Sequence, residues 1–186
     1  MSASKKDELV EKALEVFYRE GFHATGMDRL VAETRISKTS MYKHFRTKED
    51  LILATLKLRD QRFRESFMRT TEQLASDPEG QILATFDALE AWFQDPKFKS
   101  CMFIKASSEY QDPSHPIHKE SADHKRLLHE YLEKLAKEAG LKAPRAVAAQ
   151  LQLLQEGAIV LAHLHGGSES AKDAKTAART ILDAAR

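Results

Sequence analysis

Apolar residues recur at every third or fourth position along most of the chain, which is the period of an amphipathic α-helix. The first such run places Leu9, Leu14 and Phe17 on one helical face, and Gly21 ends it. No segment alternates Val, Ile or Thr in the way that predicts a β-strand, and the chain holds only 7 Gly and 5 Pro. The pattern predicts an all-α chain with helices at about 5–20, 27–34, 37–45, 47–74, 79–93, 100–110, 117–139, 144–164 and 170–185.

Residues that suit helix termini mark the expected starts and ends. A hydroxyl followed three residues later by an acid forms a capping box, and the four candidate pairs are Ser4/Asp7, Thr25/Asp28, Thr47/Asp50 and Ser170/Asp173. Helices break at Asp95-Pro96, Asp112-Pro113, Gly140 and Gly166-Gly167. The first three helices are short and the later ones are long. We therefore expect an N-terminal module of residues 1–50 and a larger helical body of residues 51–186.

Composition narrows the class of protein. The net charge of the 186 residues is only +1, so affinity for nucleic acid requires local segregation of charge. Cys101 is the single cysteine, which excludes an intramolecular disulfide and points to a reducing compartment. The charged N-terminus lacks the apolar run of a signal peptide, and no window resembles a membrane span. We expect a cytoplasmic protein that binds no membrane.

Basic residues gather in one short stretch, RISKTSMYKHFRTK at 35–48, which holds five Lys or Arg and no acid. Together with the helix before it, this stretch has the spacing of a helix-turn-helix. Ile36, Met41 and Phe45 can face the module's core while the polar side chains face outward. Such side chains bind phosphates and base edges in DNA, whereas the alternative is a short solvated helix with a basic surface.

The pattern resembles the N-terminal part of tetracycline-repressor-type (TetR/AcrR) transcriptional regulators. The matching pieces are Gly21-Phe22-x-x-Thr25, Val31-Ala32, Ser37-Lys38, Tyr42-x-x-Phe45 and Lys48-Glu49-x-Leu51. The resemblance implies a three-helix DNA-binding module, in which Thr25 and Lys48 contact phosphates and the second helix of the motif enters the major groove. The candidate DNA-binding residues are Thr25, Arg35, Ser37, Lys38, Thr39, Ser40, Tyr42, Lys43, His44 and Lys48.

One turn departs from the family pattern. The family usually has a small residue and then glycine between the two helices of the motif, whereas this chain has Thr34 and Arg35. A residue other than glycine at positive φ costs about 1 kcal/mol. Either the turn has another shape, or Arg35 is tolerated there because it reaches DNA.

The resemblance also implies that the C-terminal body binds a small effector and dimerises. Residues 100–113, which include Glu109-Tyr110-x-Asp112-Pro113, are similar to a segment that lies beside the effector cavity in one subgroup. Large adaptable side chains that line such a pocket are equally those of an ordinary core. The candidate pocket residues are Phe86, Leu89, Trp92, Phe93, Cys101, Met102, Phe103, Tyr110 and Gln155.

Apolar residues at steps of three and four in the last two helices are suited to a partner helix, and we expect these helices to form half of an intersubunit four-helix bundle. The alternative is packing within the chain. The candidate dimer residues are Leu151, Leu154, Ala158, Leu161, Ala178 and Ile181.

Two further kinds of chemistry have weak support. His115, His118, His124 and His129 lack the spacing of metal ligands on one helix, so we expect neither a metal nor another cofactor. Cys101 is expected at a helix N-terminus, where thiols become reactive, but a free cysteine more often behaves as a small buried apolar residue.

The leading hypothesis is a homodimeric repressor that binds a near-palindromic operator in double-stranded DNA and is released by a small molecule. One alternative is an architectural DNA-binding protein without an effector. The other is a helical metal-dependent enzyme using His115, His118 or Glu109, for which neither a catalytic triad nor a phosphate loop is visible.

Overall fold

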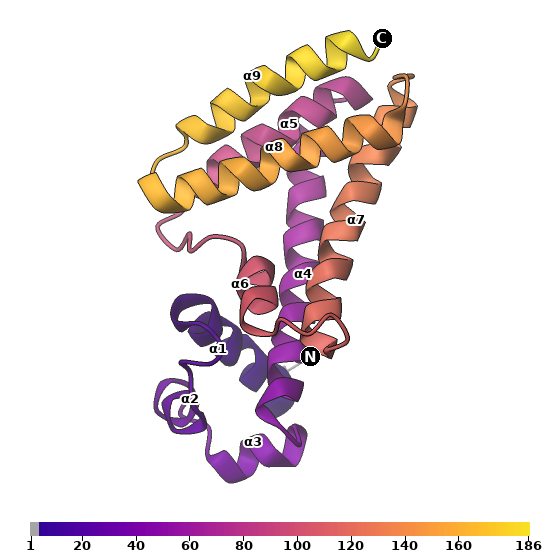
Figure 1. Cartoon of the computed structure of the whole chain (residues 1–186). Coiled ribbons are helices and arrows are strands. Elements are labelled where there is room, and N and C mark those ends of the chain that lie inside the picture. Colours follow the sequence, from indigo (N-terminus) through magenta and orange to yellow (C-terminus); the bar gives the residue numbers. More distant parts are fainter. Residues whose placement is uncertain (1–3) are drawn as a thin grey trace. The chain divides into compact units, whose positions relative to one another are not determined.

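The computed structural model describes residues 4–186, and every regular element in this range is an α-helix (Figure 1). This confirms the expected all-α class. The bounds lie within two residues of most predicted ones. The helices are α1 Lys5–Glu20, α2 Met27–Thr34, α3 Lys38–His44, α4 Lys48–Leu74, α5 Pro78–Phe93, α6 Met102–Glu109, α7 Pro116–Glu138, α8 Pro144–His165 and α9 Glu169–Ala184.

Two of the four predicted capping boxes are present. The Ser4 hydroxyl accepts from the Asp7 amide, and the Asp7 carboxylate accepts from the Ser4 amide. Thr47 and Asp50 exchange the same pair of bonds, each of 3.0 Å.

The other two predicted caps are wrong, because their hydroxyls donate to backbone carbonyls instead. The N-cap of α2 is Gly26, and the Thr25 hydroxyl donates to the Gly21 carbonyl instead. The N-cap of α9 is Ser168, and the Ser170 hydroxyl donates to the Ala158 carbonyl. A helix start can therefore be predicted from sequence more safely than its cap.

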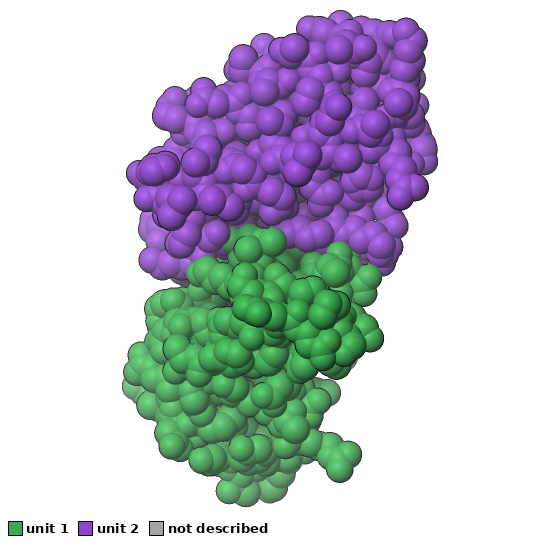
Figure 2. Space-filling view, in the orientation of Figure 1, with its two compact units in different colours: residues 1–62, 101–124 green, residues 63–100, 125–186 purple. Residues whose placement is uncertain are grey.

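The chain divides into two compact units (Figure 2). The division falls inside α4 and α7. Unit 1 comprises residues 1–62 and 101–124, so α6 and the start of α7 pack with the N-terminal helices. Its core consists of the fully buried Leu9, Phe17, Phe22, Leu30, Met41, Leu51, Ile52, Leu56 and Met102. This compact unit is larger than the expected module of residues 1–50, and the boundary at residue 50 stays a prediction about function.

Unit 2 comprises residues 63–100 and 125–186, in which α5, α8 and α9 pack side by side (Figure 1). Small side chains let α8 and α9 approach closely, and Ala158 and Ala178 are among those buried. The Lys175 ammonium lies 2.6 Å from the Asp87 carboxylate, which ties α9 to α5. These contacts give unit 2 a core of its own.

Candidate nucleic-acid interface

The α3 helix has one buried and one exposed side, as its sequence predicts. Met41 is buried in α3 and Phe45 directly after it, whereas Tyr42 keeps 47% of its surface exposed. The Ser37 hydroxyl accepts from the Ser40 amide at 3.2 Å and so caps the helix. The exposed side chains of α3 are Lys38, Thr39, Tyr42, Lys43 and His44. They offer cations, a hydroxyl and aromatic edges, which suit phosphates and base edges.

The turn between α2 and α3 has the left-handed conformation. Arg35 has φ 57° and ψ 26°, and its amide donates to the Val31 carbonyl at 2.9 Å. The buried Thr34 hydroxyl donates to the Leu30 carbonyl at 2.7 Å and accepts from the Ile36 amide at 3.2 Å. The turn thus keeps the backbone shape that glycine favours, while the Arg35 side chain remains exposed beside α3.

Thr25 and Lys48 lie differently from the expectation that both point to phosphates. Thr25 is fully buried, and its hydroxyl donates to the Gly21 carbonyl at 2.6 Å. The Lys48 ammonium donates to the carbonyls of Phe22 at 2.9 Å and Thr25 at 3.3 Å. Both side chains therefore hold the loop that joins α1 to α2. The Lys48 partners are carbonyls 26 and 23 residues away, for which the sequence carried no signal, whereas the Gly21 carbonyl lies only four residues before Thr25.

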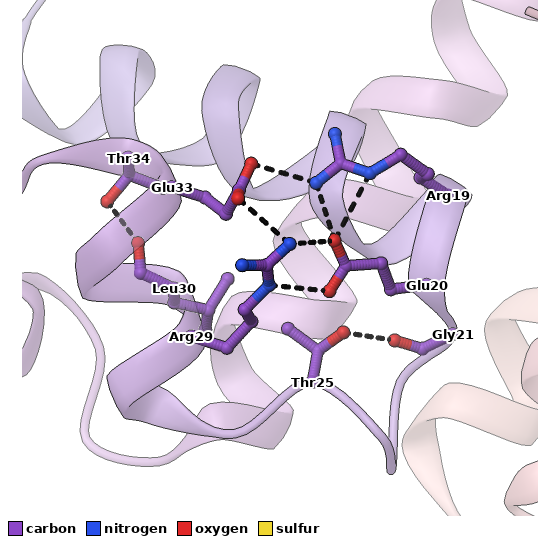
Figure 3. A network of polar contacts seen from close by, with 8 residues as sticks. All are labelled: Arg19, Glu20, Gly21, Thr25, Arg29, Leu30, Glu33 and Thr34. Carbon is purple, nitrogen blue, oxygen red and sulfur yellow. Dashed lines mark hydrogen bonds and ion pairs between the residues drawn. The ribbon is translucent and has the colours of Figure 1, made fainter.

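Four alternating charges join α1 to α2 (Figure 3). The Glu20 carboxylate binds Arg19 at 2.6 Å and Arg29 at 2.8 Å, and Glu33 binds the same two arginines at 2.8 and 2.9 Å. The hydrogen bonds from Arg29 and then Arg19 lower the pKa of Glu20 from 4.5 to about 2. The network links the end of α1 to α2 at the surface of unit 1.

Two basic residues join the candidate interface without having been assigned to it from the sequence. The Lys6 ammonium lies 5.3 Å from the ring centroid of Phe45, so the start of α1 lies beside the end of α3. Arg46 is exposed directly after Phe45. Lys38 is partly balanced by Asp28, whose carboxylate lies 3.4 Å away. In the sequence, the only feature that marks Lys6 is its position in the adjacent pair Lys5-Lys6.

Comparison with known proteins identifies this arrangement. The family model described as "Bacterial regulatory proteins, tetR family" matches residues 9–55. A TetR-family regulator from Streptomyces coelicolor superposes with a TM-score of 0.90 at 28% identity, over 96% of this chain and 88% of that one. A putative TetR regulator from Streptomyces avermitilis gives a TM-score of 0.86 at 28% identity, over 98% of both chains. The chain belongs to the TetR family of transcriptional regulators.

A curated relative covers nearly the whole of this TetR-family chain. The HTH-type transcriptional regulator YjdC of Escherichia coli is 23% identical over 98% of this chain and 95% of its own length. Relatives and fold are those of DNA-binding transcriptional regulators, not of enzymes. The family match falls on α1, α2, α3 and the start of α4, the same helices that carry the basic side chains described above.

The candidate pocket residues of the TetR regulator are mostly buried. In unit 2, Phe86, Leu89 and Phe93 are buried on α5, and Trp92 is half-buried with its ring centroid 4.9 Å from that of Phe98. The buried Gln155 side chain donates to the Thr85 hydroxyl at 2.8 Å, so this amide links α8 to α5.

The remaining pocket candidates belong to unit 1 and are buried as well: Cys101, Met102, Phe103 and Tyr110. Cys101 is the N-cap residue of α6, and its side chain makes no capping hydrogen bond. The Phe103 ring stacks on His124 with centroids 3.7 Å apart, and His124 Nδ1 lies 2.7 Å from the Asp60 carboxylate. The sequence did not predict this buried pair of His124 and Asp60.

The predicted dimer residues are divided between two sides of α8 and α9. Leu151, Ala158 and Ala178 are buried within the chain, because α5, α8 and α9 pack on one another. Leu154 and Ile181 are half-buried, and Leu161 is 48% exposed. The most exposed large apolar side chains of α8 are Leu153, Val160, Leu161 and Leu164. An apolar stripe of α8 is therefore exposed in the single chain, and of its residues only Leu161 belongs to the predicted dimer set.

The four histidines considered as metal ligands all have protein partners. His118 Nδ1 lies 2.8 Å from the Tyr110 carbonyl, and His129 Nδ1 lies 3.2 Å from the Gln152 amide oxygen. Among residues 4–186, no group of three or more His, Cys, Asp or Glu side chains is arranged to hold a metal ion. No helix in this part of the chain is long and apolar enough to cross a membrane.

Proposed function

We propose that the protein is a homodimeric repressor that binds a near-palindromic operator through α2 and α3 and leaves it when a small molecule binds to residues 51–186. The observation that carries this proposal is the two-sided α3 helix, whose buried Met41 fixes it to the module and whose exposed side is cationic and acid-free. Release by an effector rests on family membership, since TetR-family regulators usually respond to small molecules.

The residues of α3 divide by role. We propose that Lys38, Thr39 and Tyr42 read base edges and that Lys43 and His44 contact phosphates. Ser37, Ser40 and Arg35 border this surface and add contacts to the backbone of the DNA. Phosphate contacts position a protein on the duplex, and base contacts specify the site.

Thr25 and Lys48 support this surface from behind. Thr25 keeps the loop before α2 in shape. Lys48 is half-buried and has three donors, of which two serve the loop carbonyls, so the third is left for a phosphate.

The candidates for effector binding are aromatic and apolar side chains of α5 and α8 in unit 2 and, separately, of α6 in unit 1. Pockets for small molecules are lined mostly by such groups with a few polar ones. The residues are Phe86, Leu89, Trp92, Phe93, Cys101, Met102, Phe103, Tyr110 and Gln155.

DNA binding is tested with a site selected from random DNA and followed by fluorescence anisotropy at several salt concentrations. We expect Lys38→Ala and Tyr42→Ala to weaken the selected site by roughly 1–3 kcal/mol while changing scrambled DNA much less. Lys57→Ala removes an exposed lysine from α4 and serves as the charge control. Selection of no site, or equal effects of all three variants, would refute the assignment.

Effector release is tested separately. A thermal-shift screen identifies compounds that bind the folded protein, since a ligand that binds only the native state raises its midpoint. The proposal requires that at least one such compound releases the selected DNA. An architectural protein without an effector binds the DNA and shows no such release.

A further inference from the structure

Glu109, the last residue of α6, lies against the loop that leads from α1 into the DNA-binding motif. Its carboxylate accepts hydrogen bonds from the Phe22 amide at 3.0 Å and the His23 amide at 2.5 Å, which lie 87 and 86 positions away in the chain. His23 Nδ1 is 3.5 Å from the same carboxylate. Two adjacent backbone amides thus share one charged acceptor, which is a strong form of hydrogen bonding.

The loop is shaped to receive this carboxylate. Gly21 has φ 87°, and a Cβ placed there would lie 3.2 Å from Glu109 Oε1, so a side chain at this position would crowd the acceptor. On the other side of the loop, the Lys48 ammonium donates to the Phe22 carbonyl. The backbone around Phe22 is therefore held by an anion from α6 and a cation from α4.

The end of α6 is itself held in place. Tyr110 is buried, and its ring packs against those of His23 and His115, each with a centroid distance of 4.8 Å. The Tyr110 carbonyl lies 2.8 Å from His118 Nδ1 on α7. The contacts of Tyr110 therefore hold the backbone next to Glu109 in place.

The loop ends where the motif begins. Gly26 is the N-cap of α2, and its carbonyl accepts the first helical bond, from the Leu30 amide at 3.1 Å. A shift of residues 21–26 therefore shifts the start of α2, and with it α3, which is joined to α2 by the short turn at Arg35.

We propose that Glu109 is a positioning residue for DNA binding: its carboxylate fixes the loop between α1 and α2 and so sets the orientation of the DNA-reading helices. The proposal rests on the proposed function. It makes α6 a direct support of the recognition surface, although Glu109 itself lies outside the predicted interface and carries the charge that DNA repels.

The experiment compares Glu109→Ala, Glu109→Gln and the wild type in amide exchange and operator binding, at a temperature where circular dichroism shows all three to be folded. In Glu109→Ala we expect the Phe22 and His23 amides to exchange at least about tenfold faster and the operator affinity to fall about tenfold. The salt dependence should stay unchanged, because no phosphate contact is lost. Glu109→Gln keeps one neutral acceptor and should fall between the two.

Glu15→Gln removes an exposed carboxylate from α1 in the same unit and is the matched control for charge. The proposal is overturned if the Glu109 variants bind the operator like the wild type, if their loop amides exchange unchanged, or if Glu15→Gln has the same effect. The proposal is also contradicted if Glu109→Gln binds the operator no more tightly than Glu109→Ala does. Failure of the wild type to bind any DNA refutes the proposed function instead, so the two failures are distinct.

Discussion

Arg35 combines a backbone cost with a place beside the DNA-reading helix. Its φ of 57° lies in the region that favours glycine, and the turn closes there with the bond to the Val31 carbonyl. Of the two explanations open from the sequence, a turn of another shape is excluded. The exposed guanidinium at this position is consistent with a contact to DNA that offsets the strain.

Replacement of Arg35 by glycine separates the two effects. We expect Arg35→Gly to raise the free energy of unfolding by ~0.5–1 kcal/mol, because the left-handed conformation no longer crowds a Cβ. The operator affinity should fall, since a cation is removed from the surface. Urea denaturation and fluorescence anisotropy measure the two quantities on the same samples.

Arg35→Asn provides the control for the first substitution. Asparagine tolerates the left-handed region better than most residues and carries no charge, so it should lose DNA affinity as glycine does while changing stability less. If Arg35→Gly were no more stable than the wild type, the left-handed turn would not be strained in the protein.

At the scale of elements, the network around Glu20 links α1 to α2. The pKa of this carboxyl is lowered to about 2 by hydrogen bonds from Arg29 and Arg19. A lowered pKa in the folded state means that the stabilisation is present above the unfolded pKa, near 4.5, and is lost as the pH falls towards 2.

We therefore expect a loss of stability between pH 4.5 and about 2 in the wild type that is smaller in Glu20→Gln. Because all four side chains are partly exposed, added salt should reduce the difference between the two proteins. Urea midpoints measured across this pH range test the prediction. If the urea midpoints of both proteins fell equally at low pH, Glu20 would not make the contacts with Arg19 and Arg29 that the structure shows.

Helix bounds were predictable because apolar periodicity and breakers such as Gly21 and Pro144 are local signals. The two-sided character of α3 followed from the same signals. The roles of Lys48 and Glu109 were not predictable, because each side chain binds backbone groups brought close only by folding. Thr25 makes a local bond to the Gly21 carbonyl, four residues away, where a phosphate contact and a helix cap were expected. The family resemblance named Thr25 and Lys48 but not their partners.

The outward face of α8 shows a second limit. This helix carries apolar residues around more than one side, and a spacing of three and four fits both the side with Leu151 and the side with Leu161. Only the packing of α5 and α9 reveals that the first side is covered. An apolar pattern thus predicts that a helix is buried more reliably than it predicts which partner buries each face.

For the whole molecule, the exposed stripe of α8 supports a two-fold dimer. Leu153 and Leu164 are 73% and 67% exposed, which is unusual for two leucines on one helix. A groove between α8 and α9 runs beside them and is lined by Gly157, Leu161 and Ala174 among others. In a two-fold interface each patch meets its own copy, so a leucine of one protomer has an apolar groove available on the other.

The prediction is that Leu164→Glu and Leu153→Glu dissociate the dimer. Burial of one leucine contributes about 1.5–3 kcal/mol, and each substitution acts twice across a two-fold interface, so the dissociation constant should rise by at least about a hundredfold. Gln150→Glu adds the same charge at an exposed polar position of α8 and should leave the dimer intact. Sedimentation velocity at micromolar concentration measures the association directly.

In operators bound by a dimer, the two helix-turn-helix motifs lie about one DNA turn apart, roughly 34 Å. The monomeric variants should therefore lose their affinity for the palindromic operator while keeping weak affinity for a half-site. A wild-type protein that sediments as a monomer and still binds the palindrome tightly would contradict the dimer. If the Leu153→Glu and Leu164→Glu variants remained dimeric, the dimer interface would lie elsewhere on the protein.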